Sequence, residues 1–542
     1  MIGRFGRRAF LQAMAALTAA GPGRAPAADD ASRIALVVGN NSYPQSPLIN
    51  AANDARAMAG VLTEAGFKVD ARIDASSAAL AQSVREFGEA AARPETKLAI
   101  FYYAGHGAQV EWRNFLVPVD TRVASEGDLR RKAFDMGTVL DALPKNPAGK
   151  SFVIILDACR DNPFGADFRP PRGGLSPFDA PLSTLIAFST SPGSLASDGS
   201  GANGLYTENL ARELKVPGLR IEEVFKRVRA NVSIASRGLQ IPWESTSLVG
   251  DIFMFPPRAP PSEEEQERMF EEEVALWTRI KGSKKPADWA GLLREFPNGK
   301  LCEIAQARLN VLLAQAQPAA SRGLRPRRQI VLGRGLPVPE FLRRDENPYS
   351  AGTYPLDRHF NVGDDARYSL TAEDTKGERE VGRHVTAVDI EGDRVEMNDG
   401  KFVTDLMGNL LTRGEERFEV PVQVAPAELQ VGKRWSARFR TSRRSGERFD
   451  EEMTAAIVAR ERIAVPAGEF DAFRIEAEIS GRSADAFMKR RKSPGARARR
   501  AELTFWEVPG LNFPVKERQV LYRRNGEMEI TSFELRSLRQ KE

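Results

Sequence analysis

The chain has 542 residues, which is long for one compact domain and predicts two to four of them. Hydrophobic residues make up 42% and charged residues 28%, a balance that favours neither disorder nor a bundle of membrane helices. The net charge of +5 is small for this length, and the basic clusters at 325–328 and 489–500 contain no aromatic residues. Nucleic-acid binding therefore has little support, and we expect these clusters to be solvated loops.

The first 28 residues have the pattern of an export signal. Arg7 and Arg8 precede an apolar stretch at 13–20, and small residues at 25–27 offer a cleavage site. A charged start, a short apolar core and a small-residue end are typical of a secretory signal. The paired arginines and the Phe-Leu that follows them resemble a twin-arginine signal, which exports folded protein. We expect a periplasmic or otherwise exported protein; the alternative is an uncleaved anchor, for which the apolar run is short.

Residues 32–257 alternate between strand and helix patterns. Short apolar runs predict buried strands at 34–38, 98–103, 152–156 and 185–188, and a further short strand at 69–73. Between them, apolar residues at helical spacing predict helices at 52–62, 80–91 and 221–235. The alternation predicts an α/β domain with a mostly parallel sheet flanked by helices.

The pattern changes twice beyond this domain. Apolar residues at helical spacing on either side of the turn at 297–299 predict a short helical hairpin module over 262–317. Residues 318–340 are rich in Arg, Gly and Pro and predict a linker. Over 341–542, short β-type runs separated by Gly, Asn and Asp predict an antiparallel β domain, either a sandwich or an open barrel. No catalytic constellation is visible there, so we expect a binding or structural role.

Two motifs carry chemistry, and each directly follows a predicted buried strand. His106 stands in Tyr-Tyr-Ala-Gly-His-Gly, and Cys159 stands in Asp-Ala-Cys-Arg, 53 residues later. Alone, such a histidine is more often a hydrogen-bonded structural residue, and such a cysteine a small core residue. Together they bring a base and a nucleophile to the carboxyl edge of one parallel sheet, where ligands bind. The pair predicts nucleophilic catalysis by a thiolate. A bridge from Cys159 to Cys302, the other cysteine, would consume this thiol.

These motifs make residues 33–255 similar to the caspase and metacaspase clan, close to its prokaryotic members. The match includes the strand at 36–40, the Leu-Ile-Asn-Ala-Ala-Asn-Asp phrase at 48–54 and the Gln-Ile-Pro-Trp phrase at 240–243. The resemblance implies a cysteine endopeptidase in which Cys159 forms an acyl-enzyme and His106 transfers protons. The backbone amides of Gly107 and Cys159 are implied as oxyanion donors. A third catalytic carboxylate is not required.

The resemblance also implies a substrate preference. In metacaspases, an aspartate two positions before the cysteine and another in the early Asn-Asp phrase form an acidic pocket for Arg or Lys. Asp157 and Asp54 occupy these positions. The alternative is that Asp54 caps the first helix and Asp157 braces the sheet edge. Arg169 and Arg172 lie in the connector that follows the nucleophile, which is a candidate for self-cleavage or an uncut surface loop.

No metal or other cofactor is expected. The carboxylates Asp120, Glu126, Asp128 and Asp161 do not reproduce the calcium cluster of some metacaspases, and histidines and cysteines are too few for a zinc site. The predicted partners are protein or peptide substrates, with no nucleic acid and no integral membrane segment. Two alternatives remain: a peptide-binding scaffold in which the β domain is the functional part, and acyl transfer to an amine. The natural substrate and the oligomeric state stay open.

Overall fold

The computed structural model describes residues 32–541 apart from 148, 159–163, 165–167, 171–172, 192–200, 258–260, 317–328, 343–346, 357, 375–376, 392–393, 444–447, 484–498 and 523–526. The expected export signal, Cys159 and Arg172 lie outside the described residues.

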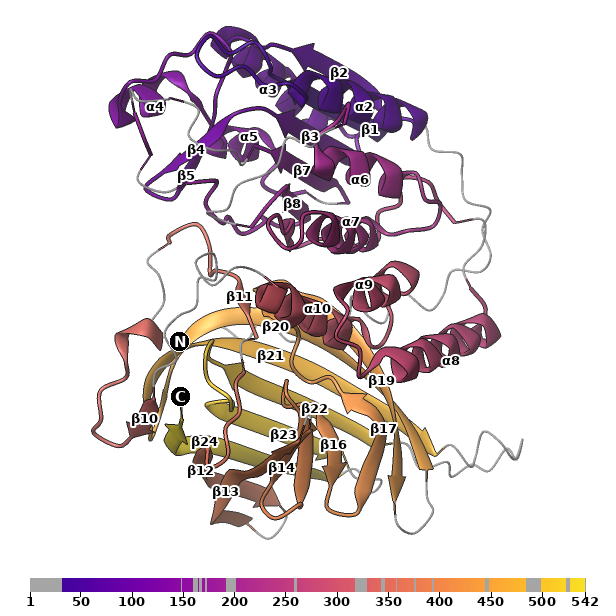
Figure 1. The fold of residues 1–542 in the computed structure, drawn as a ribbon, viewed down its shortest axis with the longest axis vertical. Helices are drawn as coiled ribbons and strands as arrows, with labels where there is room; N and C mark the ends of the chain where they lie inside the picture. Colours follow the sequence, from indigo (N-terminus) through magenta and orange to yellow (C-terminus); the bar gives the residue numbers. More distant parts are fainter. Residues whose placement is uncertain are drawn as a thin grey trace.

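The N-terminal domain is built on a six-stranded sheet in the part of the chain that the structure describes (Figure 1). Its strand order is β2-β1-β3-β7-β8-β9; the first five strands are parallel, and β9 runs antiparallel to β8. The bounds are β1 (Arg33–Gly39), β2 (Lys68–Ile73), β3 (Leu98–Ala104), β7 (Ser151–Asp157), β8 (Thr184–Phe188) and β9 (Trp243–Thr246). The expected mostly parallel sheet is confirmed.

Helices cover both faces of this sheet, because alternate strand residues point to opposite sides. Val37 packs in a cluster with α2, α6 and α7, whereas Val38 packs in a cluster with α3 and α5. The helices are α2 (Ala51–Glu64), α3 (Ser77–Ala92), α4 (Glu126–Lys132), α5 (Gly137–Ala142), α6 (Leu205–Leu214) and α7 (Ile221–Ala235). A small antiparallel sheet of β4 (Gly107–Val110), β5 (Arg113–Leu116) and β6 (Phe134–Asp135) follows β3.

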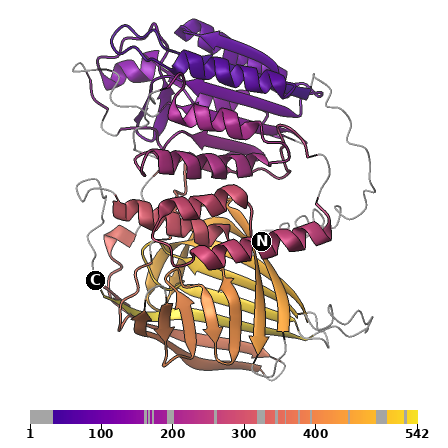
Figure 2. The same cartoon turned by 45° about the vertical axis from the view of Figure 1, so that its right-hand side comes forward.

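Three helices separate this domain from the C-terminal sheet (Figures 1 and 2): α8 (Glu263–Ile280), α9 (Pro286–Glu295) and α10 (Cys302–Ala316). Helix α8 begins at a capping box, in which the Ser262 hydroxyl accepts from Glu265 N and the Glu265 carboxylate accepts from Ser262 N. Glu273 accepts hydrogen bonds from the backbone N–H of Lys300 and Leu301. This carboxylate on α8 thereby fixes the start of α10.

The C-terminal domain is one antiparallel sheet that closes on itself. Within the described residues it has thirteen strands, from β10 through β24. Strand β24 pairs with β12 along one edge and with β23 and β10 along the other, and this double pairing closes the ring. The antiparallel β domain that the sequence predicted is confirmed, but its sheet is a closed ring and not a sandwich or an open barrel. Strand β10 lies within the stretch predicted as a linker.

The strands of this ring are β10 (Ile330–Gly333), β12 (Asp365–Asp374), β13 (Gly377–Glu391), β14 (Arg394–Met397), β15 (Phe402–Asp405), β16 (Leu410–Arg413), β17 (Glu416–Val422), β19 (Arg434–Arg443), β20 (Arg448–Val465), β21 (Gly468–Ser483), β22 (Arg499–Glu507), β23 (Lys516–Tyr522) and β24 (Met528–Gln540). A separate short pair joins β11 (Tyr354–Pro355) to β18 (Glu428–Leu429), and one short 3-10 helix, η2, spans Glu340–Leu342.

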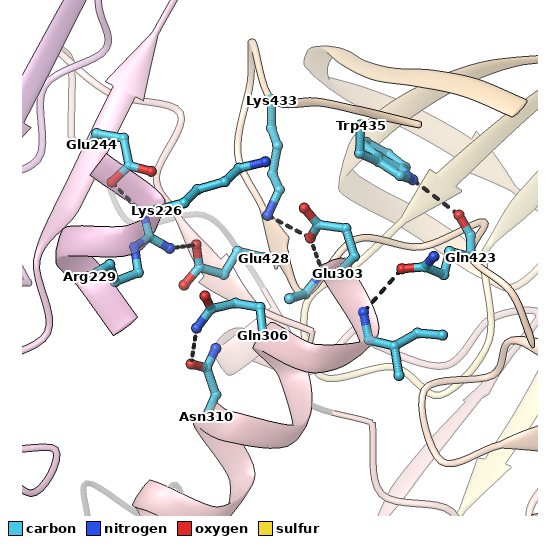
Figure 3. A network of polar contacts seen from close by, with 12 residues as sticks. Lys226, Arg229, Glu244, Glu303, Gln306, Asn310, Gln423, Glu428, Lys433 and Trp435 are labelled. Atoms are coloured by element: carbon cyan, nitrogen blue, oxygen red, sulfur yellow. Dashed lines mark hydrogen bonds and ion pairs between the residues drawn. The ribbon is translucent and has the colours of Figure 1, made fainter. Parts of the chain in front are cut away.

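A buried ion cluster joins the two domains (Figure 3). Arg229 on α7 lies 2.7 Å from Glu244 Oε2 on β9 and 2.7 Å from Glu428 Oε2 on β18. Only 6% of the Arg229 side chain is exposed. Burial opposes its charge, but the two carboxylates outweigh this effect and raise the pKa of Arg229 above its usual value. The α/β domain and the C-terminal domain are thus joined by an ion cluster to which each contributes charged side chains.

A second contact ties the loop between β7 and β8 to the segment between β10 and β12. The Asp179 carboxylate accepts hydrogen bonds from the Ser350 hydroxyl and the Ala351 amide, each at 2.7 Å. Beside it the rings of Phe178 and Tyr349 are stacked 5.2 Å apart. The end of the predicted connector is therefore anchored to the C-terminal region. Among the described helices, none has the length and apolar character needed to cross a membrane.

Candidate active site

The two motifs that the sequence analysis singled out follow the matched ends of neighbouring parallel strands. In the register of β3 and β7, Ala104 is the partner of Asp157. Just beyond, Gly105 N donates to the Asp157 carbonyl oxygen at 3.3 Å. His106 is thus two residues past one strand end, and Cys159 is two residues past the other. Although Cys159 itself lies outside the described residues, the backbone that leads to it runs beside the backbone that leads to His106.

The orientation of the His106 ring is fixed by a backbone carbonyl. Nε2 lies 2.7 Å from the Ser46 oxygen, which can only accept, so Nε2 carries the hydrogen. In the neutral imidazole, Nδ1 is then the basic nitrogen, and this atom is buried. The ring also packs against Tyr43, with centroids 4.3 Å apart. The sequence analysis singled out neither Ser46 nor Tyr43. Ser46 contributes only its backbone carbonyl, so its residue type gives no signal.

Two tyrosine hydroxyls hold the backbone around His106. The Tyr43 hydroxyl accepts from His106 N at 3.0 Å and donates to the Val117 carbonyl at 2.9 Å. The Tyr103 hydroxyl oxygen lies 3.0 and 2.9 Å from the His106 and Val117 carbonyl oxygens, which share its one hydrogen. Burial raises the pKa of Tyr43 to about 12, so it stays a neutral donor at physiological pH.

Gly105 and Gly107, on either side of His106, lie too close to neighbouring atoms for a side chain at either position. A Cβ on Gly105 would lie 2.7 Å from the hydroxyls of both Tyr43 and Tyr103. A Cβ on Gly107 would lie 2.9 Å from the Ala158 carbonyl oxygen. No side chain fits at such distances without movement of the neighbour, so Gly107 permits direct contact between the histidine segment and the residue before Cys159.

The backbone amide of Gly107 points away from strand β5. Val117 N donates to the His106 carbonyl, which makes His106 and Val117 a hydrogen-bonded pair of the small sheet. Hydrogen-bonded and non-hydrogen-bonded pairs alternate in antiparallel sheets, so the next pair, Gly107 with Leu116, is of the second kind. The Gly107 N–H is therefore directed out of the pairing, as an oxyanion donor must be.

The two predicted pocket aspartates face one another across Gly204. A Cβ on that glycine would lie 3.1 Å from Asp54 Oδ2 and 3.8 Å from Asp157 Oδ2. Gly204 N donates to Asp54 Oδ1 at 2.8 Å, and the Thr207 hydroxyl donates to Asp157 Oδ2 at 2.8 Å. Both carboxylates are buried. The structure thus brings together Asp54 and Asp157, and it adds Thr207 as a residue that the sequence did not single out.

The remaining candidates are placed as follows. Arg169 is exposed in the connector. Cys302 is a free, buried thiol on α10, and burial raises its pKa to about 11, which makes it a poor nucleophile. Asp128 lies within ion-pair distance of Lys132 and Arg131 on its own helix, at 2.9 and 3.2 Å.

Glu126 pairs with Arg130, and Ser77 N donates to Asp120. Asp161, the last acidic candidate for calcium, lies outside the described residues. In the described ranges, no three His, Cys, Asp or Glu side chains are grouped to hold a metal ion.

Comparison with known proteins gives the domain its family. Residues 32–253 match the family model of the caspase domain. Among solved structures, the chain is similar to caspase-1 from Spodoptera frugiperda, at 16% sequence identity and a TM-score of 0.32, over 42% of this chain and 92% of that one. No curated protein matches the sequence. Residues 32–253 therefore carry a caspase domain, which supports a caspase-like cysteine peptidase.

Proposed function

We propose that the protein is an endopeptidase in which Cys159 is the nucleophile and His106 transfers protons. One observation carries the proposal: both residues follow registered ends of the adjacent strands β3 and β7, where the backbones are hydrogen-bonded through Gly105 and Asp157. A base and a thiol delivered by two neighbouring strands to one sheet edge can act on a single peptide bond.

The reaction follows from the groups available. The Cys159 thiolate attacks the peptide carbonyl and forms a tetrahedral intermediate whose oxyanion accepts from the Gly107 and Cys159 amides. Nδ1 of His106 takes the thiol proton of Cys159 and passes it to the leaving amine, since Nε2–H is held by the Ser46 carbonyl. The same nitrogen then takes a proton from water, which hydrolyses the acyl-enzyme and releases the thiol.

We further propose cleavage after Arg or Lys. Two buried carboxylates beside Gly204 favour a cationic side chain, because a guanidinium or ammonium would compensate their charge in a site with little water. Thr207, which donates to Asp157, is neutral and does not itself compensate the negative charge of that carboxylate. An acidic substrate residue would meet like charge there.

The decisive experiment measures fluorophore release from short peptides that end in Arg, Lys or Asp. Wild type should cleave the Arg and Lys peptides, and Cys159→Ala and His106→Ala should not. Cys302→Ala is the matched control, because this buried thiol lies on α10, outside the caspase domain, and should leave turnover intact. Turnover that survives in Cys159→Ala would exclude a cysteine peptidase. Product masses distinguish hydrolysis from transfer to an amine.

The place of action is proposed from the N-terminal pattern of residues 1–28. We propose export by the twin-arginine route, with a mature start near Ala28. Replacement of Arg7 and Arg8 by lysine should then keep the protein in the cytoplasm, as measured by fractionation and by mass spectrometry of the N-terminus. Normal export of that variant would reject this route.

A further inference from the structure

The closed sheet of the C-terminal domain encloses a cavity of about 830 Å³. Strands β12 to β17 and β19 to β23 all contribute lining residues, so the cavity lies inside the ring. Along β22 the inward residues alternate: Ala501, Leu503, Phe505 and Glu507 line the wall, whereas Thr504 does not. This is the two-residue period of a strand with one face toward an enclosed space.

Most of the wall is apolar. Seven phenylalanines line it, together with valine, leucine, isoleucine and methionine side chains; the phenylalanines are Phe360, Phe402, Phe418, Phe439, Phe449, Phe505 and Phe513. A cavity of about 150 Å³ lined by such residues stays dry and binds benzene, so this one has room for roughly thirty non-hydrogen atoms. Its shape and lining suit a hydrocarbon chain, whose burial is favourable by about 0.8 kcal/mol per methylene.

One end of the cavity carries a buried ion pair. Arg358 Nη2 lies 2.7 Å from Glu507 Oε1, and only 7% and 4% of the two side chains are exposed. Arg358 Nη1 donates to the Met407 carbonyl at 2.7 Å. Gly408 makes this possible, because a Cβ there would overlap the guanidinium. The pair is thus built into the wall by a specific turn.

Three polar atoms at this end have no hydrogen-bond partner among the described residues: Arg358 Nε, Glu507 Oε2 and Thr404 Oγ1. Thr404 precedes the 405–409 turn that holds Arg358, so the three belong to one region of the wall. The other buried carboxylates of the lining are hydrogen-bonded, Glu451 by Thr441 and Glu517 by Gln519. Buried polar groups are normally satisfied, so these three atoms are sites that a bound ligand or an ordered water would satisfy.

The opposite end of the cavity reaches solvent. Leu521 lines the wall and is 41% exposed, and the Arg500 side chain, also in the wall, is 49% exposed. Ala501 begins the inward run of β22 that Glu507 ends. Six strand steps separate them, which corresponds to about 20 Å. The cavity is therefore elongated, with a polar closed end and a mostly apolar shaft, also lined by Glu451 and Glu517, that leads to the exposed end.

We propose that this cavity binds a single-chain acyl amphiphile with a small, uncharged, hydroxyl-bearing head, of the monoacylglycerol type. The chain occupies the phenylalanine-lined shaft. The head enters first and reaches the closed end, where one hydroxyl donates to Glu507 Oε2 while head oxygens accept from Arg358 Nε and Thr404 Oγ1.

An uncharged head fits because the Arg358–Glu507 pair is already neutral. A carboxylate or ammonium at this depth would add a buried charge without a counter-ion, at a large cost in desolvation. A headless hydrocarbon would fill the shaft but leave the three polar atoms unsatisfied. The order of affinity should therefore be monoacylglycerol, then alkane, then ionised fatty acid.

The test is displacement of N-phenyl-1-naphthylamine, a dye that fluoresces in apolar sites, from the purified full chain. Wild type should bind the dye, and 1-monolauroylglycerol should displace it at least about tenfold more tightly than laurate at pH 8. Leu503→Trp fills the shaft and should abolish dye binding. Thr504→Trp is the matched control, because the same side chain on the outward face of the same strand should change nothing.

A second variant tests the head site without emptying the shaft. The double substitution Arg358→Met and Glu507→Leu replaces the ion pair by apolar side chains of similar volume, which proteins often tolerate. Affinity for 1-monolauroylglycerol should fall at least about tenfold, while affinity for dodecane stays within about threefold.

Three results would overturn the proposal: no dye binding by wild type, equal affinity for the glycerol ester and laurate, or unchanged ester affinity in the double variant. All three are independent of peptidase activity, so they are read equally well on Cys159→Ala protein.

Discussion

Gly107 and Ala158 are in direct backbone contact: a Cβ on Gly107 would come within 2.9 Å of the Ala158 carbonyl oxygen and 3.1 Å of its Cβ. Gly107 follows His106 and Ala158 precedes Cys159, so the spacing between the two proposed catalytic residues is set where these backbones touch. A substitution there changes that spacing without altering either reactive group.

Gly107→Ala should therefore lower kcat/KM for an Arg peptide by tenfold or more, since a displacement of about 1 Å in a catalytic pair can cost about a hundredfold. Gly60→Ala is the matched control. Gly60 is an exposed position of α2 with no atom within 4 Å of a Cβ, so activity should be unchanged and stability should rise by about 0.5–1 kcal/mol. Full activity in Gly107→Ala would show that this contact does not set the spacing.

Asp157→Asn should lower kcat/KM for an Arg peptide by about 30-fold or more, because loss of a desolvated charge partner costs about 2–5 kcal/mol. The Thr207 hydroxyl can still donate to the asparagine oxygen, so the fold should persist. The measurement is the cleavage of a peptide library by wild type and by Asp157→Asn. A strong preference for Asp in wild type would reject the acidic pocket.

Self-cleavage after Arg169 or Arg172 should give new termini in incubated wild type but not in Cys159→Ala, as measured by intact mass. Arg169 is exposed, as a cleavage site must be, whereas an uncut surface loop is the alternative. Because Asp179 is held by Ser350 and Ala351, the two pieces should remain together in native gel filtration and separate only in denaturant. Identical masses in both proteins would identify the uncut loop.

Arg229→Met should destabilise the protein by about 3–5 kcal/mol, because Glu244 and Glu428 would remain as buried carboxylates without their counter-ion. Arg268→Met removes an exposed pair with Glu272 on α8 and should change stability by less than about 0.5 kcal/mol. Urea unfolding followed by tryptophan fluorescence compares the two. Equal effects would mean that the interdomain cluster contributes no more than a surface pair.

Glu273 should make stability fall as pH rises. Burial raises its pKa to about 7, against the ordinary 4.5, although the Leu301 and Lys300 amides partly oppose this. Between pH 4.5 and pH 7 the folded state keeps a proton on Glu273 that the unfolded state has lost. The contribution of Glu273 to the free energy of unfolding is therefore full below pH 4.5 and is lost as the pH rises through 7. Wild type should thus lose about 3 kcal/mol relative to Glu273→Gln between pH 4 and pH 8, as measured by urea unfolding. A constant difference would contradict the raised pKa.

The sequence predicted best where local pattern and burial coincide. Strands β1, β3 and β7 are apolar runs buried on both faces, and their ends led directly to His106 and Cys159. Strands such as β12 and β23 carry no clear apolar alternation in the sequence, since in β23 even the inward positions include Glu517 and Gln519. The tautomer of His106 could not be predicted either, since it depends on a Ser46 carbonyl that any residue would supply.

Ring closure was likewise beyond a local reading, because it rests on pairing between strands far apart in the chain, Asp365 with Arg539 among them. No turn or hydrophobic period encodes such a pairing. The cavity follows from closure, so the same alternating residues that predicted only a β domain also line a binding site.

The seam of the ring has a kinetic consequence. Strand β24 is the last strand of the sheet along the chain, and until it is synthesised the edges of β12 and β23 have no partners. Pairings between such distant segments form slowly, and unpaired edges are templates for aggregation. Production of the native protein should therefore be limited by the lifetime of the open ring. A chaperone that shields these two edges should raise the yield more than one that acts on the caspase domain.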